Sequence, residues 1–85
     1  MSTDYQRRID RVIDHIGAHL ADPLDLAALA GVAHFSPWHF HRIFHALTGE
    51  TLAEHVRRAR LEAAAGRLLR RPRESALSIA LEVGF

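Results

Sequence analysis

Apolar residues recur at intervals of three and four along most of this chain, the spacing that places them on one face of an α-helix. Residues 4–20 carry the first such pattern. Asp22-Pro23 ends it, because the residue before a proline disfavours helical geometry. A second, short helix is expected after Asp25, a good N-cap, followed by a corner over residues 31–35. The inward positions of the two helices are Ile9, Val12, Ile13, Ile16 and Leu20, then Leu26, Leu29 and Ala30.

A third helix has a clear start signal. Ser36 is a favoured N-cap, and Pro37 suits the first helical position, where its missing N–H costs nothing. The pattern predicts a helix from Ser36 to Leu47 that stops at Thr48-Gly49, since glycine is common just past a helix end. Its inward positions are Phe40, Ile43, Phe44 and Leu47.

Two further helices follow. Thr51 and the glutamate three residues later form a capping box, which predicts a long helix over residues 51–70. Ser75 is expected to cap a short final helix. The apolar positions are Leu52, Val56, Ala59, Ala63 or Ala64, and Leu68 in the long helix, then Leu77, Ile79 and Ala80 in the last.

The segments that begin at Asp25 and at Ser75 match each other at an offset of 50 residues. The first segment continues into the helix from Ser36, whereas the second stops at Phe85, so we expect a second two-helix unit that is cut off at its turn. The remaining matched pairs are Leu29 with Ile79, Ala30 with Ala80, Ala33 with Val83, and Phe35 with Phe85.

The pattern therefore predicts an all-α fold. It consists of a helix-turn-helix three-helix core over residues 4–49, a long linker helix over 51–70, and the first helix of a truncated second helix-turn-helix over 75–85. Leu77, Ile79, Leu81 and Phe85 are expected to be exposed in that last part.

The composition narrows the class of protein. A hydrophobic content of 48%, three prolines and five glycines suit a compact helical domain. There is no cysteine, so disulfides and thiolate zinc ligands are excluded. The polar first residues do not resemble a signal peptide, and no apolar run reaches the roughly 20 residues of a membrane span. We expect a cytoplasmic protein with no membrane partner.

The basic residues, all arginines, are concentrated in one segment. The net charge is only +1, yet seven of the 11 basic residues lie between residues 55 and 73, where Glu62 is the only acid. Such a cluster on a nearly neutral chain can attract phosphates. Arg57 and Arg58 are candidates to lie along a nucleic-acid backbone, and Arg60 is expected to pair with an acid of the first helix. Solvated positions are expected for Arg67, Arg70, Arg71 and Arg73.

The outer face of the helix from Ser36 carries the candidate chemistry: Trp38, His41, Arg42 and His45. A helix-turn-helix places its second helix in the DNA major groove. There Arg42 can donate two hydrogen bonds to guanine O6 and N7, His41 can donate or accept, and Trp38 can contact sugar or a thymine methyl. The free N–H groups at Ser36 suit a phosphate oxygen.

Other interpretations of these side chains remain open. Trp38 can instead pack on Phe35 at the corner. Arg42 can be solvated or pair with an acid such as Glu50.

Histidines raise the question of a metal. His15 with His19 and His41 with His45 each lie four residues apart, a spacing that can place two imidazoles on one metal ion. Neither pair has an acid in the arrangement of a zinc motif, so we predict no metal site and no cofactor. No phosphate-binding glycine loop, nucleophile elbow or paired acid motif is present, and no enzymatic activity is expected.

The segment LDLAALAGVAHFSPWHFHRIFHALTG resembles the first helix-turn-helix of the AraC/XylS family of bacterial transcription regulators. Residues 79–85 resemble the family's I-A-x-x-x-G-F signature at the start of its second helix-turn-helix. Together the matching blocks span about residues 8–85. The positions that fit the family's linker helix are Val56, Arg60, Leu61, Ala64, Leu68 and Leu69.

The resemblance implies a sequence-specific DNA-binding domain of a transcription regulator. In the family, two recognition helices enter successive major grooves on one side of double-stranded DNA. By motif match, Trp38, His41 and Arg42 fall at base-contacting positions, and Ser36 and His45 fall near the backbone. RNA polymerase is an implied partner, and a small-molecule effector is expected only if a further domain lies outside this chain.

The sequence departs from the family pattern at two positions. His34 stands at the corner where the second unit has Gly84, so a left-handed conformation is expected at a non-glycine residue. His55 occupies a position that is often tyrosine. Without a second recognition helix, weak operator binding is expected. The competing hypothesis is a helical protein-interaction module that does not contact DNA.

Overall fold

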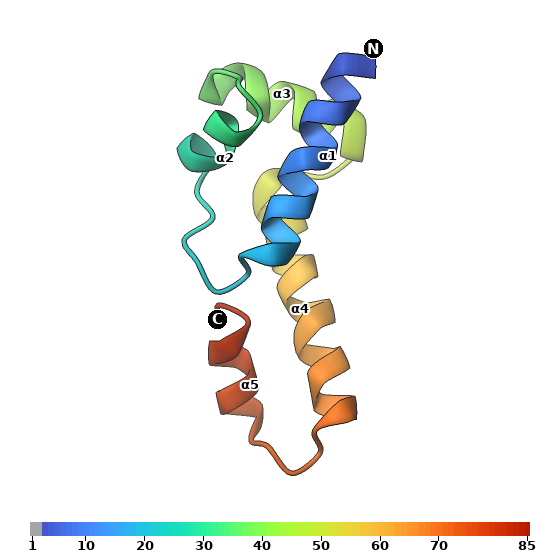
Figure 1. Cartoon of the computed structure of the whole chain (residues 1–85), viewed down its shortest axis with the longest axis vertical. Coiled ribbons are helices and arrows are strands. Elements are labelled where there is room, and N and C mark those ends of the chain that lie inside the picture. The colour runs from blue at the N-terminus through green and yellow to red at the C-terminus, as the bar shows by residue number, and fades with distance from the viewer. Residues whose placement is uncertain (1–2) are drawn as a thin grey trace.

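The computed structural model describes residues 3–85, and within that range it contains five helices and no strand. Figure 1 shows α1, α2 and α3 gathered at one end of the molecule, with α4 leading away from them and α5 folded back beside the far half of α4. The predicted all-α fold is confirmed. The helices are α1 (Thr3–Ala18), α2 (Leu26–Val32), α3 (Pro37–Thr48), α4 (Leu52–Arg70) and α5 (Ala76–Glu82).

The helices begin where the capping residues predict. The side chains of Asp25, Ser36, Thr51 and Ser75 each accept a hydrogen bond from the backbone N–H three residues later. Gly49 ends α3 in the left-handed conformation with φ of 76°. The four capping side chains bond to backbone N–H groups that would otherwise be unpaired, and each cap stabilises its helix by about 1 kcal/mol.

The end of α1 differs from the prediction. The helix stops at Ala18 rather than at residue 20, because the N–H of His19 bonds to Ile16 O and the chain turns there. This early end frees the carbonyl of Leu20, which bonds to Arg60 across the molecule.

The main core lies where α1, α2, α3 and the start of α4 meet. Phe40 and Phe44 are fully buried, with ring centroids 5.6 Å apart, and they fix which side of α3 faces inward. The other members are Ile9, Val12, Ile16, Leu29, Ala30, Ala33, Leu52 and Val56.

The expectation for α5 was partly wrong. Ile79 is fully buried, as is Val83, because α5 folds back against α4. Glu82 supports this packing by ion pairs of 2.9 Å to Arg67 and 3.1 Å to Arg71. Leu77, Leu81 and Phe85 are exposed as expected, at 69%, 61% and 49%.

The repeat seen in the sequence is also present in the backbone. The N–H of Phe35 donates to Ala30 O at 3.0 Å, and the N–H of Phe85 donates to Ala80 O at 2.9 Å. The residue before each is left-handed, His34 with φ of 58° and Gly84 with φ of 100°. The conformation expected at His34 is therefore confirmed, and the two corners have the same geometry.

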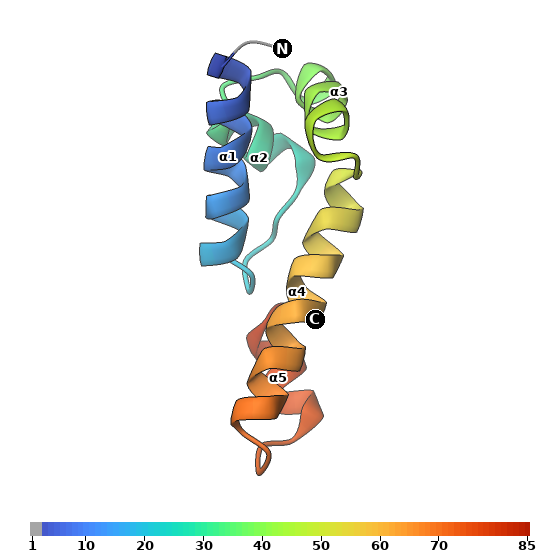
Figure 2. The same ribbon diagram turned by 90° about the vertical axis from the view of Figure 1, so that its right-hand side faces the viewer.

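Arg60 connects the two halves of the molecule. It does not pair with an acid of α1, as the sequence suggested; its Nε donates to Leu20 O at 2.9 Å and its Nη2 to Asp22 O at 3.0 Å. The Leu20 carbonyl also contacts Gly84, where a Cβ atom would lie 2.1 Å from that oxygen. Figure 2 shows α4 as the element that spans both ends. The contacts at its middle therefore fix the α5 corner against the loop after α1.

No helix within residues 3–85 combines the length and the apolar character needed to cross a membrane.

Candidate nucleic-acid interface

The exposed face of α3 is fixed by the buried one. With Phe40 and Phe44 fully buried, the side chains between them on the other side of the helix point to solvent. Trp38 is 68% exposed, an unusual position for the largest apolar side chain in the protein. The other exposed side chains of this face are His41, Arg42 and His45.

Trp38 and Arg42 interact with each other. The guanidinium carbon of Arg42 lies 5.0 Å from the centroid of the Trp38 ring, within the range of a cation–π contact. Both side chains border a shallow hollow of about 400 Å³ on the outer side of α3. The pair forms a flat aromatic surface beside a set of guanidinium donors, and both can face a nucleic acid.

The alternative interpretation of Trp38 is wrong. The corner is packed by His39, whose ring centroid lies 5.0 Å from that of Phe35, and by Tyr5 at 5.2 Å. Trp38 is largely exposed and does not take part in the packing of this corner.

The proposed pairing of Arg42 with Glu50 is not found either, because other groups surround that carboxylate. Arg58 Nε donates to it at 2.8 Å and His55 Nδ1 lies 2.9 Å from it. The hydrogen bonds from Arg58 and from His55 lower the pKa of Glu50 to about 2. This carboxylate therefore stays charged throughout the neutral range and is held at the start of α4.

Of the two arginines predicted to contact a DNA backbone, Arg58 is already engaged. It also donates to Glu62 at 3.0 Å, and its two carboxylate partners raise its pKa. Arg57 is exposed and makes no ion pair or side-chain hydrogen bond with the residues that the structure describes. Arg57 is therefore the better placed of the two for an external anion.

His55 is buried at the joint between α3 and α4. Its ring meets that of Phe44 edge-on with centroids 5.4 Å apart, and its Nδ1 faces Glu50. The imidazole therefore joins the aromatic core to the ion-pair network.

Sequence reasoning missed one residue at the corner, Arg8 of α1. Its Nε donates to Ala33 O at 2.7 Å, and its Nη2 donates to His34 O. The guanidinium carbon lies 3.7 Å from the centroid of the Phe35 ring. Arg8 thus binds both carbonyls at the end of α2 and covers the aromatic ring that precedes α3. Locally Arg8 forms an ion pair with Asp4, one helical turn earlier, at 3.3 Å. Nothing local in the sequence marks its role at the corner, since the two carbonyls lie 25 and 26 residues away.

The histidine pair at the end of α1 forms a stacked contact. The rings of His15 and His19 stack with centroids 4.0 Å apart, and Nδ1 of His19 hydrogen-bonds to His15 O at 2.8 Å. In the part of the chain that the structure describes, no group of three or more His, Cys, Asp or Glu side chains is arranged to hold a metal ion.

Comparison with known proteins agrees with this arrangement. A family model described as a helix-turn-helix domain matches residues 29–85, from the middle of α2 through α5. Regulatory protein SoxS of Salmonella typhimurium is 32% identical over 95% of this chain and 75% of its own length.

Two larger relatives match over shorter parts of their length. The bifunctional transcriptional activator/DNA repair enzyme AdaA of Bacillus subtilis is 36% identical over 66% of this chain and 26% of AdaA. The right origin-binding protein of Escherichia coli is 41% identical over 79% of this chain and 23% of that protein. The chain thus spans three quarters of SoxS and about a quarter of the other two.

Proposed function

This chain belongs to the AraC/XylS family and forms a DNA-binding domain of a transcription regulator, and from this premise we propose that it reads the DNA major groove with the exposed face of α3. The observation that supports this role is the Trp38–Arg42 pair on that face. An arginine held by an aromatic ring loses fewer rotamers when it binds, so more of its hydrogen-bond energy remains as affinity.

Arg42 is proposed to make the main base contact. Its fork of donors fits guanine O6 and N7 in the major groove, a contact that discriminates by about 1–3 kcal/mol against the wrong base. His41 is exposed beside it and can donate to or accept from a neighbouring base edge. Trp38 is proposed to contact a thymine methyl or the sugar with the part of its ring that Arg42 leaves open.

Backbone contacts are proposed at both ends of α3. Pro37 has no N–H, and the N–H of His39 donates to the Ser36 side chain. The N–H of Trp38 is therefore the donor that the first turn offers to a phosphate oxygen. His45 is exposed near the other end. Arg57 adds a cation from α4, whereas Arg58 would have to leave Glu50 and Glu62 to reach a phosphate.

The remaining proposals concern the regulator as a whole. SoxS is a regulatory protein, and AdaA is in part a transcriptional activator. We therefore propose a cytoplasmic regulator that contacts RNA polymerase after binding DNA. No enzymatic step is assigned to the residues of this domain.

Selection of binding sequences from random duplexes tests the base-reading role. The chain should enrich a motif, and Arg42→Ala should lose preference at one or two base pairs of that motif while its circular dichroism stays unchanged. Arg70→Ala, which removes an exposed arginine at the far end of α4, is the matched control and should keep the full motif. An unchanged motif for Arg42→Ala would show that Arg42 does not read a base. Salt-insensitive association with proteins, without any duplex binding, would favour an interaction module instead.

A further inference from the structure

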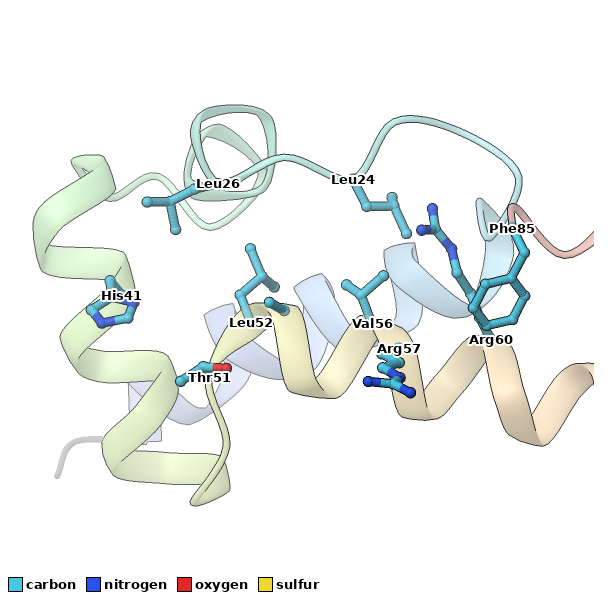
Figure 3. A pocket seen from close by; sticks show the side chains of 10 residues that line it. Leu24, Leu26, His41, Thr51, Leu52, Val56, Arg57, Arg60 and Phe85 are labelled. Atoms are coloured by element: carbon cyan, nitrogen blue, oxygen red, sulfur yellow. The ribbon is translucent and has the colours of Figure 1, made fainter.

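A hollow of about 450 Å³ lies between the segment that leads into α2 and the first half of α4 (Figure 3). Leu24 and Leu26 form one wall, and Leu52 and Val56 of α4 form the other. The volume lies within the range of small-molecule sites, about 300–1,000 Å³. Mostly apolar walls of this kind fit a hydrocarbon body and not a hydrated ion.

The rim of the hollow is cationic. Arg57 lies at its mouth, and His41 reaches it from α3 at one end (Figure 3). Arg60 also lines it, but its guanidinium is held by two backbone carbonyls. No acidic side chain lines the hollow within the part of the chain that the structure describes. The free charge at the opening is therefore the guanidinium of Arg57, which makes no ion pair with the residues that the structure describes.

Phe85 closes the other end of the hollow. Its ring is half exposed and stands beside Arg60 (Figure 3). An aromatic ring at the end of an aliphatic slot favours a flat aromatic ligand, since the two rings can meet edge to face.

From these features we propose that the hollow is a binding site for an aromatic monocarboxylic acid. The ring of the ligand enters between the leucine walls, and its carboxylate pairs with Arg57 at the mouth. A carboxylate matches the planar donor fork of arginine. A single charge suits the site, because a second one would have to enter the apolar part.

The site is linked to DNA binding through shared residues, and this part of the inference rests on the proposed function. His41 and Arg57 are proposed DNA contacts and also border the hollow. A carboxylate on Arg57 removes a cation from the DNA surface. Ligand and duplex should therefore weaken each other's binding by the same factor, as thermodynamic linkage requires.

The binding site is tested in the free protein, without DNA. 2-Naphthoate is titrated into the ¹⁵N-labelled chain and followed by NMR, with neutral 2-naphthamide as the matched probe. We expect saturable shifts at Leu24, Leu52 and Val56 with a dissociation constant below about 1 mM, the affinity that a ligand of this size can reach. 2-Naphthamide should bind about tenfold more weakly, because it lacks the charge.

Two variants separate the proposed site from a nonspecific apolar surface. Ala53→Phe fills the hollow from an exposed alanine that lines it and should abolish the shifts, whereas Ala65→Phe, elsewhere on α4, should not. Arg57→Gln should weaken 2-naphthoate about tenfold and leave 2-naphthamide unchanged. The proposal is wrong if both probes bind equally, or if Ala53→Phe binds 2-naphthoate as the wild type does. It is also wrong if the same resonances move with protein concentration alone. That result would assign the hollow to a second copy of the chain.

The link to DNA is a separate measurement. Saturating 2-naphthoate should raise the dissociation constant of a selected duplex for the wild type and not for Ala53→Phe. If 2-naphthoate binds the free protein as described but duplex affinity does not change, the site stands and the proposed link to DNA is wrong. A chain that binds 2-naphthoate but no duplex would contradict the proposed function alone.

Discussion

The guanidinium carbon of Arg42 lies 5.0 Å from the centroid of the Trp38 ring, one helical turn earlier on α3. At an exposed site such a contact is worth about 0.5–1 kcal/mol. The contact restricts the guanidinium of Arg42 to one region of space in the free protein. Trp38 can thus act on base recognition through Arg42 as well as by its own contact.

This relationship predicts a loss of discrimination when the ring is removed. Trp38→Ala should reduce the preference for the selected duplex over one changed at the base pair read by Arg42, by about 0.5–1 kcal/mol. Competition anisotropy with the two duplexes measures it. Trp38→Phe keeps a ring and should retain most of the preference. Equal weakening on both duplexes would mean that Trp38 only adds contact area.

Arg57 and Arg58 should differ in their effect on salt dependence. Arg57→Gln should reduce the slope of log affinity against log salt by about 1, because one phosphate contact is lost. Arg58→Gln should leave the slope unchanged and lower stability, since it removes the ion pairs to Glu50 and Glu62. Duplex affinity is measured for both variants at several salt concentrations between about 50 and 200 mM, and the two slopes are compared. The opposite pattern would show that Arg58 leaves its acids for DNA.

Arg8 should be a stabilising residue of the corner. Arg8→Met keeps an unbranched side chain but loses the hydrogen bonds to Ala33 O and His34 O. Each hydrogen bond from a charged donor contributes about 1.5–3 kcal/mol, so a loss of at least about 1.5 kcal/mol is expected in urea unfolding. Arg7→Met, at the exposed neighbouring position, is the control. A loss no larger than that of the control would rule out the role.

The two left-handed corners should respond differently to substitution. His34→Gly removes the strain of a side chain at φ of 58° and should stabilise the fold by up to about 1 kcal/mol. Gly84→Ala should destabilise it, because the added Cβ would lie 2.1 Å from Leu20 O. Thermal unfolding of both variants measures the contrast. A destabilised His34→Gly would indicate that the imidazole itself makes a needed contact.

Acid should weaken the joint between α3 and α4. The hydrogen bonds from Arg58 and His55 lower the pKa of Glu50 to about 2, below its ordinary value of 4.5. A depressed folded-state pKa contributes stability that is complete above about pH 4.5 and is lost as the pH falls toward 2. Glu50→Gln should therefore lose stability at neutral pH and show a shallower decline over this window. Identical profiles for the two proteins would exclude Glu50 as the titrating group.

Local signals in the sequence were enough to predict the helices. The side chains of Asp25, Ser36, Thr51 and Ser75 act on backbone groups three residues away, so a short stretch of sequence contains both partners. The match at an offset of 50 residues was equally informative, because the matched alanine and phenylalanine form the same backbone hydrogen bond at both corners.

What the sequence could not predict depends on contacts between distant segments. No local pattern marks Arg8, and Arg60 was expected to pair with an acid of the first helix, yet each binds backbone carbonyls 25 to 40 residues away. The burial of Ile79 depends on how far α5 folds back on α4, which no local pattern specifies. The hollow beside Arg57 likewise exists only once α4 lies against the segment leading to α2.

The elongated shape has a consequence for the length of DNA that the domain can cover. The molecule measures 46 Å along its longest axis and 20 Å and 17 Å across the others. One turn of B-DNA is about 34–36 Å long. A domain of this length, laid along the duplex, would shield about 13 base pairs from cleavage reagents at 3.4 Å per base pair, on one side only. Hydroxyl-radical footprints should then show protected stretches separated by one helical repeat, with the opposite side of the duplex left open.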